Sequence, residues 1–428
     1  MTAPPESTKS MLLSRERILS IYLPSLVFSL GSSIVVPVLP VFARSFDITF
    51  GVASMAFVIY QVGSLCSALP AGFLLDKIGR KPILIAGPIL ISVAAFLTAT
   101  SQSFEQLLLY RFIGGLAEPL WMQARLAMIA DTVVDGERGR QVTWMVGLQS
   151  GGSLFGPSIG GILGELFGVR VPFIFYGGLV LLTLIPSLTM VTETRDVGLN
   201  LEKEELTGKT IRPSLMKELL KAHVVGFMVL SFLANMSRTA FQGGGIDLYA
   251  VYTYGVGPGL LGAIATVSTA VSLPIPFFTG YIMDRWGRKS VITPAYALIA
   301  LGLSLVTLAT LGPAPLAVYI AAVVFARVST HTASGTMQTL ATDLSPAGNR
   351  GGFLAVWRAV SHGANVTGPA LIALIAERSG FTAAFGTIAL FGLGAAGLAR
   401  FVIQETVRVP QAVAVAATMP AAETSVEK

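Results

Sequence analysis

The sequence predicts an all-α membrane protein of twelve transmembrane helices, arranged as two pseudo-symmetric six-helix bundles. The composition, the number of apolar runs and an internal duplication together give this prediction. Of 428 residues, 53% are hydrophobic and 12% are charged, and the mean hydropathy is +0.72. Ordinary soluble domains carry about 25% charged residues. The composition therefore indicates a chain that lies largely in a lipid bilayer.

Twelve apolar runs are long enough for a helix to cross the hydrocarbon, which takes roughly 20 mostly apolar residues. The predicted spans are 18–42, 51–75, 83–101, 105–130, 141–167 and 171–192, then 222–250, 259–283, 290–311, 315–341, 352–376 and 381–403. They define an N-terminal bundle over 18–193 and a C-terminal bundle over 222–404. The remaining segments are an N-terminus over 1–17, a connector over 194–221 with a short helix after Pro213, and a disordered tail over 405–428.

Lys and Arg are distributed unequally over the two sides of these spans. Twenty lie on the side of both termini and the connector, and three lie on the other, namely Arg44, Arg170 and Arg378. Because cytoplasmic loops carry the excess of basic residues, we expect both termini in the cytoplasm of a cell with an inner membrane. Such short basic loops argue against nucleic acid as a partner. A single cysteine, Cys66, excludes an intrachain disulfide and a cysteine metal cluster.

The duplication is visible in a charged loop that follows the second apolar run of each half. GFLLDKIGRKP at 72–82 recurs as GYIMDRWGRKS at 280–290, an offset of 208 positions. Asp131 and Gly156 recur at an offset of 212 as Asp343 and Gly368. The glycines of the loop allow the sharp turn between two helices. The two halves therefore share one plan.

These motifs resemble the major facilitator superfamily of secondary transporters, and the likeness extends from Ile18 to about Ile403. The repeated loop resembles that family's signature between spans two and three. Leu30-Gly31 with Pro37 to Pro40, YRFIGGLAEP at 110–119 and GLQSGGSLFGPSIGG at 147–161 resemble motifs of its twelve-span drug and proton antiporters. The resemblance implies proton-driven efflux by alternating access, with Arg111 tied to proton coupling.

The charged loop is the predicted cytoplasmic gate. We expect Asp76, Arg80 and Asp131 to form an ion-pair latch that joins the two halves in the outward-open state. The alternative is that these charges only enforce orientation in the membrane. The full set assigned to this gate is Gly72, Asp76, Gly79, Arg80, Lys81, Asp131, Asp284 and Arg288.

The fifth span carries a stripe of small residues at spacings of four or five, interrupted by a proline. Small residues let helices approach closely, and a proline bends a helix. The stripe forms either a hinge or seam between the bundles or ordinary tight packing. Its assigned residues are Gly152, Gly156, Pro157 and Gly160.

Ionisable residues inside spans cost roughly 2.5–3.5 kcal/mol each and usually face a cavity or a partner. Arg111, Glu118 and Arg125 are seven residues apart, so they share one helix face at about 10 Å, too far for direct pairing. Glu118 is interpreted as the single carboxylate well inside any span and hence as the proton-coupling residue, together with Arg111. The alternative is a fixed structural ion pair with an arginine.

Further ionisable residues are assigned to a substrate cavity: Arg125, Arg238, Arg327, His331, Arg358 and His362. A histidine there either relays protons or makes a structural hydrogen bond. Five interior arginines against one glutamate make an organic anion, possibly taken up, the alternative to export of amphipathic drugs. We expect a monomer whose partners are a small-molecule substrate, protons and lipid. No enzyme motif, cofactor or metal site is expected.

Overall fold

The computed structural model describes residues 22–68, 70–132, 138–189, 193, 215–312, 314–346 and 350–401, and these parts are helical with no strand. The expected tail at 405–428 lies outside them. The first half contains α3 (Leu23–Val35), α4 (Leu39–Arg44), α5 (Phe50–Ala68), α6 (Ala71–Ile78), α7 (Arg80–Thr100), α8 (Phe104–Thr132), α9 (Arg138–Phe167), α10 (Val171–Leu182) and α11 (Leu184–Thr189). A short helix, α13 (Leu215–Leu219), precedes the second half.

The second half repeats this order of long helices. It contains α14 (Ala222–Gln242), α15 (Gly245–Tyr254), α16 (Pro258–Ser272), α17 (Ile275–Trp286), α18 (Arg288–Thr310), α19 (Leu316–Thr332), α20 (Thr336–Leu344) and α21 (Arg350–Phe401). Within the described residues each of the first ten predicted spans lies on a helix or a pair of helices, the last two share α21, and the all-helical prediction is confirmed.

Several spans that the sequence predicts as single helices are broken in two. α3 and α4 are separated by a turn that contains Pro37, and α5 ends just before Pro70. Proline lacks an amide hydrogen and clashes with the preceding turn, which ends a helix. α14 and α15 are separated at Gly244, whose φ of 67° is the left-handed conformation that glycine tolerates best.

Nine helical segments among the described residues are long and apolar enough to cross a membrane. One of them, α21, has 52 residues, about 78 Å of helix against roughly 30 Å of hydrocarbon. It is interrupted at Gly380, where φ is 84°, between the predicted eleventh and twelfth spans. Counting α21 as two spans adds one to the nine segments, and α8 (29 residues) and α9 (30 residues) are also long enough to span. The architecture is therefore compatible with twelve transmembrane helices.

Large apolar side chains face outward as well as inward. Trp121 and Phe227 are fully buried within their bundles, whereas Phe277 and Leu166 are 80% and 70% exposed. Helices that span a bilayer present apolar residues to lipid in this way. The chain is an integral, multi-pass membrane protein.

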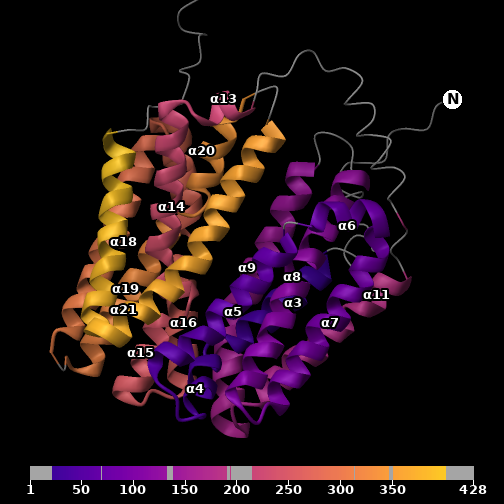
Figure 1. Cartoon of the computed structure of the whole chain (residues 1–428), viewed down its shortest axis with the longest axis vertical. Coiled ribbons are helices and arrows are strands. Elements are labelled where there is room, and N and C mark those ends of the chain that lie inside the picture. The colour runs from indigo at the N-terminus through magenta and orange to yellow at the C-terminus, as the bar shows by residue number, and fades with distance from the viewer. Residues whose placement is uncertain are drawn as a thin grey trace, which may run out of the picture.

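The two bundles lie side by side and converge at one end (Figure 1). We call this the closed end; it holds α4, α15 and the start of α16. Here the Tyr252 hydroxyl donates to the Ile48 carbonyl at 2.8 Å, and the rings of Phe50 and Phe381 lie 4.5 Å apart. The opposite end, with α6 and α20, holds the repeated loops and is called the motif end. In Figure 1 the ribbons of the bundles diverge toward it.

Candidate functional site

A cavity of about 290 Å³ is lined by both bundles. Most of its wall comes from α3, α5, α7, α8 and α10 of the first half, and a smaller part from the junction of α14 and α15 in the second. Aromatic rings form much of the surface, and three charged residues reach it. The aromatic and charged lining residues are Phe57, Tyr60, Tyr110, Arg111, Glu118, Phe173, Tyr176, Phe241 and Asp247. An apolar wall with few charges is typical of a small-molecule site.

Glu118 lies near the middle of α8 and lines this cavity, as the sequence predicted. Its carboxylate has neither a hydrogen bond nor an ion pair with any residue that the structure describes. A fixed ion pair with an arginine is therefore absent from these residues. A carboxylate without a fixed counter-ion in a cavity wall is free to interact with a bound cation.

Arg111, two turns earlier on α8, also lines the cavity. Its guanidinium lies 4.3 Å from the centre of the Tyr60 ring, and its Nε is buried without a hydrogen-bond partner in the described part of the chain. A cation over an aromatic face is stabilised by the ring quadrupole. Arg111 and Glu118 do not pair, in agreement with their spacing.

Arg125, which the sequence assigned to the cavity, lies in the core of the first bundle. It is 1% exposed, donates to the Ser25 hydroxyl at 2.6 Å and stacks 4.1 Å from the Trp121 ring. It is not part of the cavity lining. Its contacts join α8 to α3 instead.

Asp247 is a cavity carboxylate that the sequence analysis missed. It lies in the first turn of α15 with 7% of its side chain exposed, and its Oδ1 is 2.5 Å from Nη2 of Arg327 on α19. The interpretation of Glu118 as the single interior carboxylate is therefore wrong. Asp247 and Phe241 line the cavity. Arg327 contacts both of them, with its guanidinium 5.9 Å from the centre of the Phe241 ring, but does not line the cavity itself.

A local signal for Asp247 is present in the sequence. The run Gly243-Gly244-Gly245 precedes it, and three glycines inside an apolar run favour a broken helix. Broken membrane helices tend to place polar groups at a binding site near the middle of the bilayer. The predicted single span over 222–250 concealed this break.

The remaining predicted cavity residues do not line this cavity. His331 is near Arg238 and Arg327, and His362 is near Arg358 on α21. Nε of Arg238 is buried with no hydrogen bond to the described residues. The assignment of these residues to substrate binding stays a prediction.

The repeated loops adopt the same backbone conformation. Gly79 has φ 103° and ψ 166°, and Gly287 has φ 97° and ψ 165°. Only glycine adopts this region readily, so both glycines are required by the turn that the sequence predicted. Gly72 was grouped with the turn, but it lies within α6.

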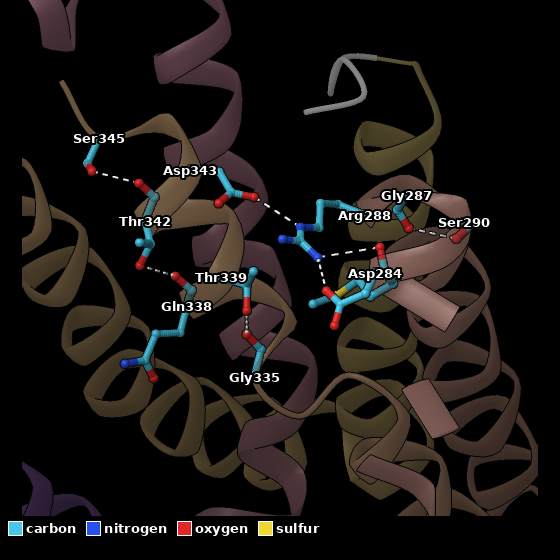
Figure 2. Close-up of polar contacts among 11 residues, drawn as sticks. Asp284, Gly287, Arg288, Ser290, Gly335, Gln338, Thr339, Thr342, Asp343 and Ser345 are labelled. Atoms are coloured by element: carbon cyan, nitrogen blue, oxygen red, sulfur yellow. Dashed lines mark hydrogen bonds and ion pairs between the residues drawn. The ribbon is translucent and has the colours of Figure 1, made fainter. Parts of the chain in front are cut away.

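The second loop holds a three-residue ion cluster. Figure 2 shows Arg288 between two carboxylates: its Nη1 is 2.8 Å from Asp284, and its Nε is 3.0 Å from Asp343 at the end of α20. All three residues belong to the second bundle. The cluster therefore ties α17, α18 and α20 together within that bundle.

The first loop has a related contact. Arg80 Nη1 lies 3.3 Å from Asp76, and the backbone amides of Arg80 and Lys81 donate to the Glu193 carboxylate at 2.9 and 3.1 Å. Glu193 thus caps the start of α7, which the sequence analysis did not anticipate. The side chain of Asp131 lies outside the described residues, so the latch between the halves stays a prediction.

The small-residue stripe of α9 has two faces. A Cβ on Gly152 or Gly156 would come within 2.7 Å or less of α3, and Gly160 also packs against α3, in the same bundle. Pro157 instead faces the second bundle: a Cβ on Gly262 of α16 would overlap its carbonyl oxygen. Tight packing within a bundle and a seam between bundles therefore occur on adjacent faces of one helix.

Comparison with known sequences identifies the family. A profile described as Major Facilitator Superfamily matches residues 21–243 and 227–425. Quinolone resistance protein NorA of Staphylococcus aureus strain MSSA476 is 27% identical over 239 residues, 56% of this chain and 58% of that protein. Multidrug resistance protein 2 of Bacillus subtilis strain 168 is 24% identical over 271 residues, 61% of this chain and 66% of that protein. The first alignment thus covers less than two thirds of the relative.

Solved structures support the same fold. The D-xylose-proton symporter superposes with a TM-score of 0.72 at 17% identity, covering 94% of this chain and 99% of that one. The inward-open xylose transporter XylE from E. coli gives 0.71 at 17% identity, with 92% and 97% covered. At this identity the likeness bears on the fold alone. The family's members are transporters and not enzymes, and this chain belongs to the major facilitator superfamily.

Proposed function

We propose that this transporter exports small amphipathic compounds, cations above all, in exchange for protons by alternating access. The observation that carries the proposal is Glu118, a carboxylate without a described partner in a cavity that both bundles line. A proton and a cationic substrate compete for such a group. Loading one releases the other, which is the requirement for exchange.

The charges at the cavity remove the argument for an organic anion. The argument for an anion was an excess of interior arginines. Arg125, however, is packed in a core, and Arg327 is neutralised by Asp247. With that pair set aside, Glu118 and Arg111 remain as the charged residues of the cavity surface, so the arginine excess does not extend to the cavity.

The names of the relatives support export, and the charge bias gives the orientation that export requires. The relatives are named for quinolone and multidrug resistance. The bias of basic residues favours a cytoplasmic motif end and cytoplasmic termini in an inner membrane. With that orientation the present arrangement, joined at the closed end, is the inward-facing one, in which a compound enters from the cytoplasm.

The proposal is tested with the full chain in proteoliposomes under an imposed pH gradient. We expect accumulation of a fluorescent lipophilic cation in vesicles with an acidic lumen, in the fraction of molecules whose motif end faces outward. An organic anion of similar size serves as the comparison. Gradient-driven accumulation of the anion but not the cation would overturn the proposed substrate class, and accumulation that follows ATP instead of the gradient would overturn antiport.

A further inference from the structure

Two acidic residues at the closed end reach from one bundle to the start of a helix in the other. They are Glu165 near the end of α9 and Glu377 in α21. We propose that they are paired positioning residues of the transport cycle: together they hold the closed end shut, and both contacts must break before the transporter opens on that side. This inference concerns the conformational change and does not depend on the proposed substrate.

The first contact joins α9 to α16. Oε2 of Glu165 accepts a hydrogen bond from the backbone amide of Gly259 at 3.1 Å. Gly259 is the second residue of α16 (Pro258–Ser272). The first amides of a helix have no partner within the helix and carry partial positive charge, so they stabilise a carboxylate. A Cβ on Gly257 would lie 2.8 Å from the same oxygen, so glycine there leaves room for the carboxylate.

The second contact joins α21 to α5. Oε1 of Glu377 accepts a hydrogen bond from the Thr49 hydroxyl at 3.3 Å, and Thr49 directly precedes α5 (Phe50–Ala68). A Cβ on Gly51, the second residue of α5, would overlap the Glu377 carboxylate. The acid therefore occupies the space that a glycine leaves free in the first turn of the helix.

The residues that form the two contacts are related by the internal repeat. Glu165 and Glu377 are 212 positions apart, the offset that also relates Asp131 to Asp343. Gly51 and Gly259 are 208 positions apart, the offset of the two charged loops. Each bundle thus supplies one carboxylate and one helix start. A chance surface contact would not be expected to recur at both repeat-related places.

This geometry has a mechanical consequence. The ion pairs described for the repeated loops, Asp76–Arg80 and Asp284–Arg288–Asp343, lie within single bundles, so these pairs can survive a rotation of one bundle against the other. The Glu165 and Glu377 contacts cross between bundles and cannot survive separation at this end. A carboxylate at a partly exposed helix start contributes a small free energy, which suits a contact that must open and close in every cycle.

The test measures the conformational equilibrium directly. Cys66 is the single cysteine and is exposed, so Cys66→Ser gives a background for spin labels at Gln102→Cys and Leu311→Cys, one in each bundle at the closed end. Pulsed EPR then reports the distance between the bundles. We expect Glu165→Gln or Glu377→Gln to raise the open fraction relative to the closed one by about two- to fivefold each, and the double variant by roughly the product.

Glu105→Gln is the matched control. Glu105 is an exposed acid in the first turn of α8 at the same end, and we expect no change in the distance distribution. Gly51→Ala gives a second, independent perturbation, because its Cβ displaces the Glu377 carboxylate. Its control is Gly178→Ala, where a Cβ meets open space.

An unchanged distance distribution in the folded double variant and in Gly51→Ala would overturn the proposal that Glu165 and Glu377 hold the closed end shut. The readout is a distance in the absence of substrate and of a pH gradient. A failure of the proposed export activity would therefore leave this result unaffected, and the converse also holds.

Discussion

The two halves of the molecule each bring one carboxylate to the cavity, and the two carboxylates differ in their partners. Glu118 from the first half faces the cavity without a described partner, whereas Asp247 from the second half is 2.5 Å from Arg327. The halves share their loops, their turns and their closed-end contacts. They do not share the chemistry of the cavity.

This difference assigns different tasks to the two acids. A carboxylate paired with a fixed cation, as Asp247 is with Arg327, holds α15 against α19. An unpaired one can exchange a proton for a substrate. Under the proposed function, the repeated contacts belong to the parts that move, and the difference at the cavity provides the group for proton coupling.

The largest effect on stability is expected when the charge of Asp247 is removed, which tests its assignment to a structural role. Asp247→Asn leaves the Arg327 guanidinium without its counter-ion, and loss of one member of a buried pair costs roughly 3–5 kcal/mol. We expect a clear fall in the temperature of unfolding in detergent. Arg327→Gln added to Asp247→Asn should recover most of the loss. Equal unfolding temperatures of the wild type and Asp247→Asn would show that the Asp247–Arg327 pair does not stabilise the fold.

Removing the charge of Glu118 should leave stability nearly unchanged and impair transport instead. Glu118→Gln removes a group with no described partner, so we expect near wild-type thermal stability. Coupling should suffer instead, with gradient-driven accumulation of a lipophilic cation falling by roughly 5- to 150-fold, the usual range for the coupling between two ligands. A large loss of stability without a loss of coupling would reverse the roles of the two acids.

The two charged loops offer a comparison of equal backbones with different surroundings. Gly79→Ala meets two obstacles: a φ of 103° and the Glu193 carboxylate 2.5 Å from the new Cβ. The backbone strain costs about 1–3 kcal/mol. We expect lower stability for Gly79→Ala, measured by thermal unfolding. Because Glu193→Ala alone removes the cap of α7, the double variant is compared with Glu193→Ala and should be the less stable of the two; equal stability would mean that the backbone carries no strain.

The smallest effect is expected at the ion cluster of the second loop. Asp343 and Asp284 flank Arg288 with 28% and 78% of their side chains exposed. Exposed ion pairs contribute about 0–1 kcal/mol. Asp343→Asn should therefore lower stability by a few tenths to about 1 kcal/mol, and Asp284→Asn by less. The inverse order in thermal unfolding at low salt would contradict this ranking by exposure.

Much of the fold was predictable because its signals are local. Hydropathy located the helices, and the loop glycines located the turns at Gly79 and Gly287, since only glycine adopts those dihedral angles readily. Glu118 and Arg111 were predicted from their position inside an apolar helix. A charge inside an apolar helix is costly whatever helices surround it, so its importance can be inferred from that helix alone.

The rest depends on which helix faces meet. The cavity position of Asp247, the core position of Arg125 and the cap formed by Glu193 each require a partner that is distant in sequence. Helix rotation and tilt set such pairs, and no pattern along one helix reports them. The break at Gly244 was the one local signal that went unused.

The most direct test of the central claim is proton release on substrate binding, measured with a pH-sensitive dye in weakly buffered nanodiscs. For a lipophilic cation we predict proton release by the wild type and by Asp247→Asn/Arg327→Gln. We predict no release by Glu118→Gln, although this variant still binds the compound. Undiminished proton release by Glu118→Gln would contradict the account and move the exchangeable proton to another residue.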